Sequence, residues 1–139
     1  IIKYLQGSDI SFVVMDFNPS VVRDLIDVGV NAIYGDIGDP EIFEYLQVER
    51  AKLVICTAVD LSDNELLLSF VKEKNPSAKI VSRATDTEHA KILKQLGADY
   101  VILPEKVSGD YIVAQLKHYW PNIHFKDISA SKNSINSLI

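Results

Sequence analysis

The chain has 139 residues, of which 47% are apolar and 24% charged, the size and composition of about one globular domain. Its net charge of −5 argues against a nucleic-acid-binding protein, because the contact surface of such proteins is normally basic. Its apolar runs are a few residues long, far below the roughly 20 residues that a membrane-spanning helix needs.

Strands and helices are predicted to alternate along the chain, five times over. After a helix end at residues 1–5, the apolar run Phe12–Met15 predicts a strand that ends on Asp16. Asn18 and Pro19 then suit the N-cap and the first position of a helix. The strands are expected at 11–16, 31–34, 52–57, 79–83 and 100–103. The helices that follow them are expected at 19–28, from 39–40 onward, and at 62–75, 85–96 and 108–119.

Asp39 and Pro40 repeat this cap-plus-proline start, and three later helix starts also carry residues that can cap a helix. Ser62 with Glu65 and Thr85 with Glu88 have the spacing of a capping box, and Ser108 is expected to cap the last helix. Parallel strands need crossover connections of this kind. The pattern therefore predicts an α/β fold, a Rossmann-like doubly wound parallel sheet.

The order of the elements predicts that this sheet is incomplete at its N-terminal end. A Rossmann half begins with a strand, a G-x-G-x-x-G turn and a helix, whereas the first element here is a helix end. We therefore expect the first strand and the glycine-rich turn to precede residue 1, within about 25–30 further residues, the size of a βα unit. In the order 3-2-1-4-5-6, that strand is central and lies between 11–16 and 52–57.

Two strand ends supply the first candidates for ligand binding. Asp16, with its neighbour Phe17, stands where a Rossmann sheet binds a ribose, and a carboxylate there favours NAD over NADP because it repels a 2′-phosphate. A solvent-exposed aspartate at a strand end is the alternative. Gly35 and Asp36 end the next strand and could line the adenine side of the same crevice, or could form an ordinary Gly-Asp turn.

Two later strand ends add three further candidates. Thr57 and Ala58 follow the third predicted strand, where they would face the phosphates or the second half of a ligand. Arg83 ends the fourth predicted strand and could anchor a phosphate. A surface salt bridge from Arg83 to Asp86 or Glu88 is the alternative.

The remaining chemically distinctive residues do not predict catalysis. Cys56 is the single cysteine, which is typical of a reducing cytoplasm, and its place inside an apolar strand favours a small buried hydrophobe over a nucleophile. His89, His118 and His124 show no metal-ligand spacing and are interpreted as surface residues. Nothing resembles a Ser-His-Asp set or a zinc site, so we expect neither a catalytic residue nor a catalytic metal.

Taken together, the motifs up to about Tyr119 resemble the RCK family, the regulator-of-potassium-conductance or TrkA N-terminal nucleotide-binding domain. The order and spacing of the motifs carry the resemblance more than any one of them. The matching segments are VVMDFNPSVV (13–22), AIYGDIGDPEIFEYL (32–46), KLVICT (52–57), DNELLL (63–68) and KIVSRATDTEHAKILKQLGADYVILPE (79–105).

The resemblance implies a regulatory role. Residues 1–120 would form an N-terminally incomplete RCK-type domain that binds NAD(H), ATP, ADP or AMP and has no enzymatic activity. Asp16 would bind the ribose and Asp36 the adenine side, while Thr57 and Arg83 would make further contacts. The composition of residues 121–139 is typical of a linker or tail.

The resemblance also implies partners and a location. The domain would form a homodimer or a higher homo-oligomer in the cytoplasm, at the inner face of the cell membrane, and would control a potassium channel or cation transporter as a fused part or a separate subunit. The helix 108–119 would pack on a partner subunit, or on its own sheet. The alternatives are a fragment of an NAD-dependent oxidoreductase and an assembly module without a ligand.

Overall fold

The computed structural model describes residues 1–39 and 41–120. The described residues fall into two units, one formed by Ile1–Ile102 and one that begins at Leu103. The predicted linker or tail at 121–139 lies outside the described residues.

Strands and helices alternate through the first unit, as the sequence predicts. Its elements are α1 (Ile2–Gln6), β1 (Val14–Asp16), α2 (Pro19–Asp27), β2 (Ala32–Tyr34), α3 (Ile42–Tyr45), the 3-10 helix η1 (Val48–Arg50), β3 (Leu53–Cys56), α4 (Leu61–Lys74), β4 (Lys79–Arg83), α5 (Thr87–Gln95) and β5 (Tyr100–Ile102).

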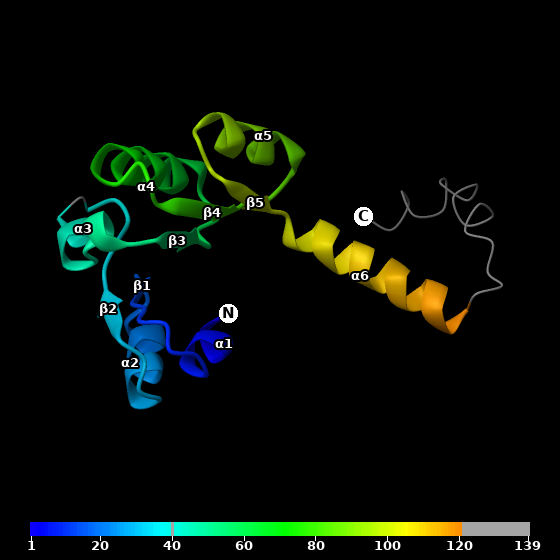
Figure 1. The fold of residues 1–139 in the computed structure, drawn as a ribbon, viewed down its shortest axis with the longest axis horizontal. Coiled ribbons are helices and arrows are strands. Elements are labelled where there is room, and N and C mark those ends of the chain that lie inside the picture. Colours follow the sequence, from blue (N-terminus) through cyan, green and yellow to red (C-terminus); the bar gives the residue numbers. More distant parts are fainter. Residues whose placement is uncertain (40, 121–139) are drawn as a thin grey trace. The chain divides into compact units, whose positions relative to one another are not determined.

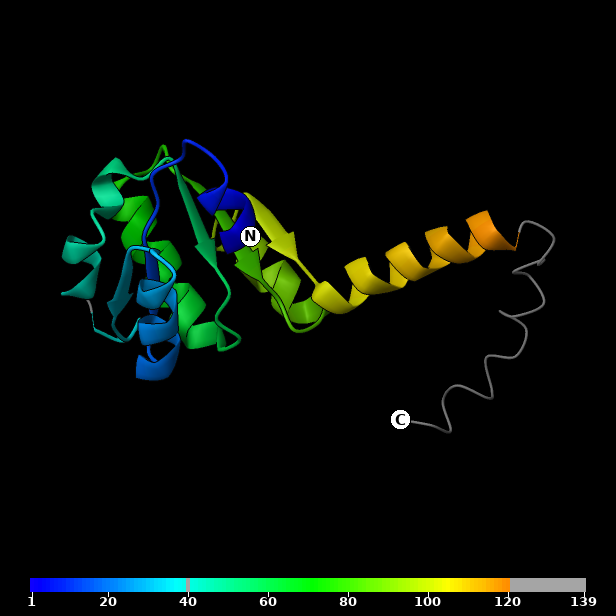
Figure 2. The ribbon, with the colours of Figure 1, turned by 90° about the horizontal axis from the view of Figure 1, so that it is seen from below.

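All strand pairs in the first unit are parallel, and they form two sheets. β1 pairs with β2, with Met15 opposite Ile33, while β3, β4 and β5 form the second sheet in that order, with Cys56 opposite Ser82. The three strands of the second sheet run side by side in the view from below (Figure 2). The α/β fold with parallel strands is therefore confirmed. β1 and β3 are not hydrogen-bonded to each other, and the central strand expected between them stays a prediction.

The main core lies between the three-stranded sheet and the helices α4 and α5, which cover the same face of it (Figure 1). The burial pattern of β4 identifies the covered face of the sheet: Ile80 and Ser82 are buried, whereas the alternate residues of the strand are more exposed. Leu68 and Val71 of α4 and Leu93 of α5 are at most 1% exposed and complete this core. Burial of these apolar side chains is the chief stabilising term for the unit.

The helix caps confirm one prediction and correct two. Asn18 caps α2 as predicted, with its side chain accepting a hydrogen bond from the Ser20 N–H. The cap of α4 is Asp60 rather than Ser62, and the cap of α5 is Asp86 rather than Thr85. An aspartate within two residues of a predicted cap competes well for that role, because its carboxylate accepts from backbone N–H groups and interacts favourably with the helix dipole.

The second unit contributes one described helix, α6 (Pro104–Tyr119). It begins four residues before the predicted cap Ser108, because Pro104 occupies its first turn instead of only ending the strand before it. None of its residues is buried, and Tyr111 and Ile112 are among its exposed apolar side chains. Over the ranges that the structure describes, no helix has the length and apolar character required to cross a membrane.

Candidate functional site

A cavity of about 460 Å³ lies in the first unit, lined by residues of β1, β3, η1 and α4 and of the loops that follow β1, β2 and β3. Six of the seven residues predicted as ligand-binding line this cavity. They are Asp16, Phe17, Gly35, Asp36, Thr57 and Ala58. The candidates share one kind of position, because all six lie at the carboxyl end of a parallel strand or directly after it, two pairs in the sheet β1–β2 and one pair after β3.

Asp16 joins the end of β1 to the two neighbouring segments. Its Oδ1 accepts a hydrogen bond from the Asn18 N–H at 2.8 Å, which shapes the turn into α2. Its backbone carbonyl accepts from the Gly35 N–H at 3.2 Å, which ties the turn after β1 to the end of β2. Phe17, the next residue, is 75% exposed and therefore does not pack in the core.

Gly35 is a close-approach glycine. A Cβ added there would lie 2.5 Å from Cγ1 of Ile42 and 3.1 Å from the sulfur of Met15, so only glycine fits without displacing α3 or β1. The atoms that exclude a Cβ at Gly35 belong to side chains of this chain. The sequence did not indicate this packing reason for a glycine. Asp36 follows, and its Oδ1 accepts from the Gly38 N–H at 2.8 Å.

The loop 57–60 after β3 forms another wall of the cavity and leads into α4. Asp60 caps α4 by accepting from the Ser62 N–H at 2.8 Å. Asn64, one turn into the helix, is fully buried, and its Nδ2 donates to the backbone carbonyls of Ala58 at 3.1 Å and Asp60 at 2.7 Å. A buried side chain of α4 therefore fixes the backbone of this loop.

The polar lining of the cavity is acidic. Four aspartates line it, and none of its lining residues is a lysine or arginine. Burial raises the pKa of Asp63, and the negative charges of Asp60 and Asp36 raise it further. The pKa of Asp60 is held below its usual range by hydrogen bonds from the Ser62 hydroxyl and backbone N–H. The lining therefore offers strong hydrogen-bond acceptors, while its donors are a hydroxyl, a thiol and backbone N–H groups.

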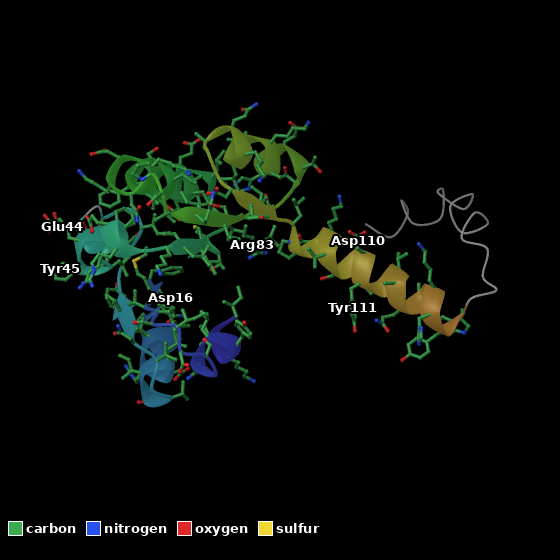
Figure 3. The ribbon with its side chains drawn as sticks, viewed as in Figure 1. Asp16, Glu44, Tyr45, Arg83, Asp110 and Tyr111 are labelled. Atoms are coloured by element: carbon green, nitrogen blue, oxygen red, sulfur yellow. The ribbon has the colours of Figure 1, made fainter. Side chains whose placement is uncertain are left out.

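Arg83 is the one predicted site residue that does not line the cavity. It ends β4 in the larger sheet, whereas Asp16 ends β1 in the smaller one (Figure 3). Within the described part of the chain, Arg83 forms no ion pair, so the alternative salt bridges to Asp86 and Glu88 are absent; Glu88 instead pairs with Lys91. The Nε of Arg83 is buried without a hydrogen-bond partner among the described residues.

The prediction that His89 lies on the surface is wrong. This residue of α5 is 7% exposed, and its Nδ1 lies 3.0 Å from the Thr85 hydroxyl and 3.4 Å from the Thr85 backbone nitrogen. The ring therefore packs over the start of α5, a contact between residues four apart that the charge pattern of the helix does not reveal. His118 is exposed on α6, and His124 lies outside the described residues.

Cys56 is buried as predicted, at 4% exposure, and burial raises the pKa of its thiol. A raised pKa keeps the thiol protonated and poorly reactive. Across residues 1–39 and 41–120, no group of three or more His, Cys, Asp or Glu side chains is placed to hold a metal ion.

Three acidic or amide residues that line the cavity or support its wall were not predicted as site residues: Asp60, Asp63 and Asn64. Asp60 could have been found as the aspartate two residues before the predicted cap. Asn64 shares a helical face with the apolar positions 67, 68 and 71, so it is a polar residue in an otherwise apolar stripe. Such a residue is normally buried with specific hydrogen-bond partners.

Known proteins resemble this chain in sequence. The chain is 30% identical over 97 residues to the glutathione-regulated potassium-efflux system protein KefC of Escherichia coli O157:H7. The match covers 70% of this chain and 16% of KefC. The chain is also 33% identical over 109 residues to an uncharacterized protein of Methanothermus fervidus, covering 17% of it. The chain thus spans about a sixth of the length of these curated relatives.

Solved structures share the fold. The TrkA-N domain of the inner membrane protein YbaL from Escherichia coli superposes with a TM-score of 0.76 at 26% identity, over 82% of this chain and 84% of that one. The GsuK channel bound to NAD superposes with a TM-score of 0.70 at 24% identity, over 79% of this chain and 20% of that one. The family model of the TrkA-N domain matches residues 1–104. The resemblance predicted from the motifs is confirmed, and the chain belongs to the TrkA-N domain family.

Proposed function

We propose that this domain binds an adenine nucleotide, NAD(H), ATP, ADP or AMP, and thereby regulates potassium or other monovalent-cation transport. The observation that carries the proposal is the gathering of Asp16, Gly35, Asp36 and Thr57 around one cavity. Relatives support it: KefC is a potassium-efflux system protein, and structures of GsuK are described with bound NAD and with bound ADP.

The chemistry of the lining suits the nucleoside part of such a ligand. One lone-pair side of the Asp16 carboxylate is used by the Asn18 N–H, which leaves the second oxygen to accept from ribose hydroxyls. The exposed ring of Phe17 offers a flat apolar surface for adenine. The carboxylate would also repel a 2′-phosphate, so NAD is favoured over NADP. Arg83, at the end of β4, is our candidate for contact with a more distant part of the ligand.

The role we propose is regulatory rather than enzymatic. A nucleotide that binds one arrangement of the domain more tightly than another shifts the population of the two by its differential affinity. The domain would act as a homodimer or higher oligomer at the inner face of the membrane, fused to or associated with a channel or transporter. The exposed apolar side chains of α6 supply a surface suited to a partner subunit.

Replacement of Asp16 tests the proposal directly. We expect Asp16→Ala to weaken NAD and ADP binding to the full chain at least about tenfold, the factor that corresponds to roughly 1.4 kcal/mol. Isothermal titration calorimetry measures this, with Asp24→Ala as the control, because Asp24 is an exposed aspartate of α2 that does not line the cavity. No detectable binding to the unmodified chain, or equal affinities in the two variants, would contradict the proposal.

A further inference from the structure

The side-chain amide of Asn64 donates hydrogen bonds only to the loop 57–60, which forms one wall of the cavity. It is 0% exposed, and both of its amide hydrogens serve backbone carbonyls of this loop, those of Ala58 and Asp60. Its Oδ1 is buried and has no hydrogen-bond partner among the described residues. A buried asparagine with this pattern holds the backbone in one conformation.

The hydrogen bond to Ala58 fixes the direction of a neighbouring backbone donor. A trans peptide is planar, and its carbonyl and N–H point in opposite directions. Because the Ala58 carbonyl points at Asn64, the Val59 N–H of the same peptide points away from α4. Among the described residues this N–H has no acceptor, and Val59 is a cavity-lining residue.

Donors are scarce in this cavity, so a fixed N–H has particular value there. Asp16, Asp36, Asp60 and Asp63 present carboxyl oxygens, which accept hydrogen bonds, and no lysine or arginine lines the cavity. A nucleotide brings ribose hydroxyls that can donate to carboxylates, but it also brings ring, ribose and phosphate atoms that must accept. The Thr57 hydroxyl and the backbone N–H groups are the donors with which the lining can bond to these acceptor atoms.

We propose that Asn64 is a positioning residue for nucleotide binding: it holds the Ala58–Val59 peptide so that the Val59 N–H donates to an acceptor atom of the nucleotide. This inference rests on the proposed function. Asn64 does not contact the ligand in this proposal. Its hydrogen bonds to the loop nevertheless contribute to the affinity for the nucleotide, in addition to their contribution to folding.

The same helix provides a matched control. Asn75, at the other end of α4, is 7% exposed, and its Nδ2 donates to the carbonyls of Val48 at 3.0 Å and Ala51 at 2.8 Å. These carbonyls belong to lining residues that precede β3, whereas the loop held by Asn64 follows β3 and carries the Val59 N–H on which the inference depends. Asn64→Leu and Asn75→Leu each remove a buried amide with two hydrogen bonds to backbone carbonyls, so both should lower the melting temperature of the full chain.

The affinities should separate the two variants. We expect the Kd for ADP and for NAD, measured by calorimetry, to rise about tenfold in Asn64→Leu, which corresponds to ~1.4 kcal/mol, and to change less than twofold in Asn75→Leu. Equal changes in the two variants would overturn the inference and leave the proposed function standing. Failure of the unmodified chain to bind either nucleotide would overturn both.

A second measurement covers the case in which Asn64→Leu does not fold. In the unmodified chain, ADP should slow the hydrogen exchange of the Val59 amide, read by NMR, because the ligand then accepts from it. An exchange rate of Val59 that saturating ADP leaves unchanged would sink the inference. A purely structural role for Asn64 predicts no such protection.

Discussion

The two sheets of the first unit differ sharply in how much they bury. The sheet β3–β4–β5 packs against α4 and α5, and Ile80 and Leu93 of this region are completely buried. The sheet β1–β2 has only two strands, and none of its strand residues is fully buried. A two-stranded sheet is marginal by itself in water. The larger sheet therefore supplies most of the stability of the unit.

The smaller sheet nevertheless supplies the residues with the clearest chemistry, Asp16 and Asp36. Segments that bind ligands are often drawn from the less stable parts of a structure, because those parts can be ordered by the ligand. The comparison implies that substitutions in the larger sheet act mainly on folding, whereas substitutions in the smaller one act on the geometry of the cavity. Matched substitutions in the two sheets can test this.

The largest effect is expected from an isoleucine in the middle of the larger core. Ile80→Ala in β4 removes a fully buried side chain and should lower the free energy of unfolding by about 2–5 kcal/mol. Ile33→Ala in β2 removes the same atoms from a half-buried position and should cost about 1 kcal/mol. Urea unfolding followed by circular dichroism measures both. Losses of equal size would show that the smaller sheet is as well packed as the larger.

A smaller effect is expected where the smaller sheet has its tightest contact. Gly35→Ala forces a Cβ to within 2.5 Å of Ile42 and should cost about 1–3 kcal/mol, because α3 or β1 must shift. Gly38→Ala, in the same loop, meets only the Asp36 carboxylate at 3.3 Å and serves as the control. Urea unfolding gives the stability, and hydrogen exchange of the Asp16–Asp36 segment shows whether the shift is local. An unperturbed Gly35→Ala variant would mean that the contact with Ile42 is not tight.

The sequence predicted the larger sheet more accurately than the loops. Predicted and observed bounds of β4 coincide at Lys79–Arg83, because a short apolar run bounded by turn residues leaves little choice of register. Six of the seven candidate site residues line one cavity, because each lies at or directly after the carboxyl end of a parallel strand. The position of Arg83 relative to that cavity depends on side-chain packing, which the strand pattern does not contain.

What the sequence did not predict are contacts between residues two to four apart whose side chains compete for the same partners. Asp60 displaces Ser62 as the cap of α4, and Asn64 bonds back to the loop instead of facing water. His89 is buried for the same reason, through Thr85. In each case two neighbouring side chains can bond to the same backbone group, and the local composition does not show which of them does so.

The smallest effect concerns electrostatics, and it too distinguishes the two sheets. All four ion pairs in the described ranges join residues between Lys72 and Asp99. Asp99 precedes β5 and binds Lys79 at 2.7 Å and the Ile80 N–H at 2.9 Å. These hydrogen bonds, Lys79 first, lower the pKa of Asp99 to about 2.

A lowered pKa means that the folded state favours the ionised carboxylate of Asp99. Its contribution is therefore complete above about pH 4, the pKa of an unperturbed aspartate, and is lost as the pH falls to about 2. We expect Asp99→Asn to be less stable than the unmodified chain at pH 6, by a modest amount because the ion pair is partly exposed. The difference should shrink towards zero near pH 2. Thermal unfolding across this range measures it, and a difference that is independent of pH would show that Asp99 acts through the shape of its side chain rather than through its charge.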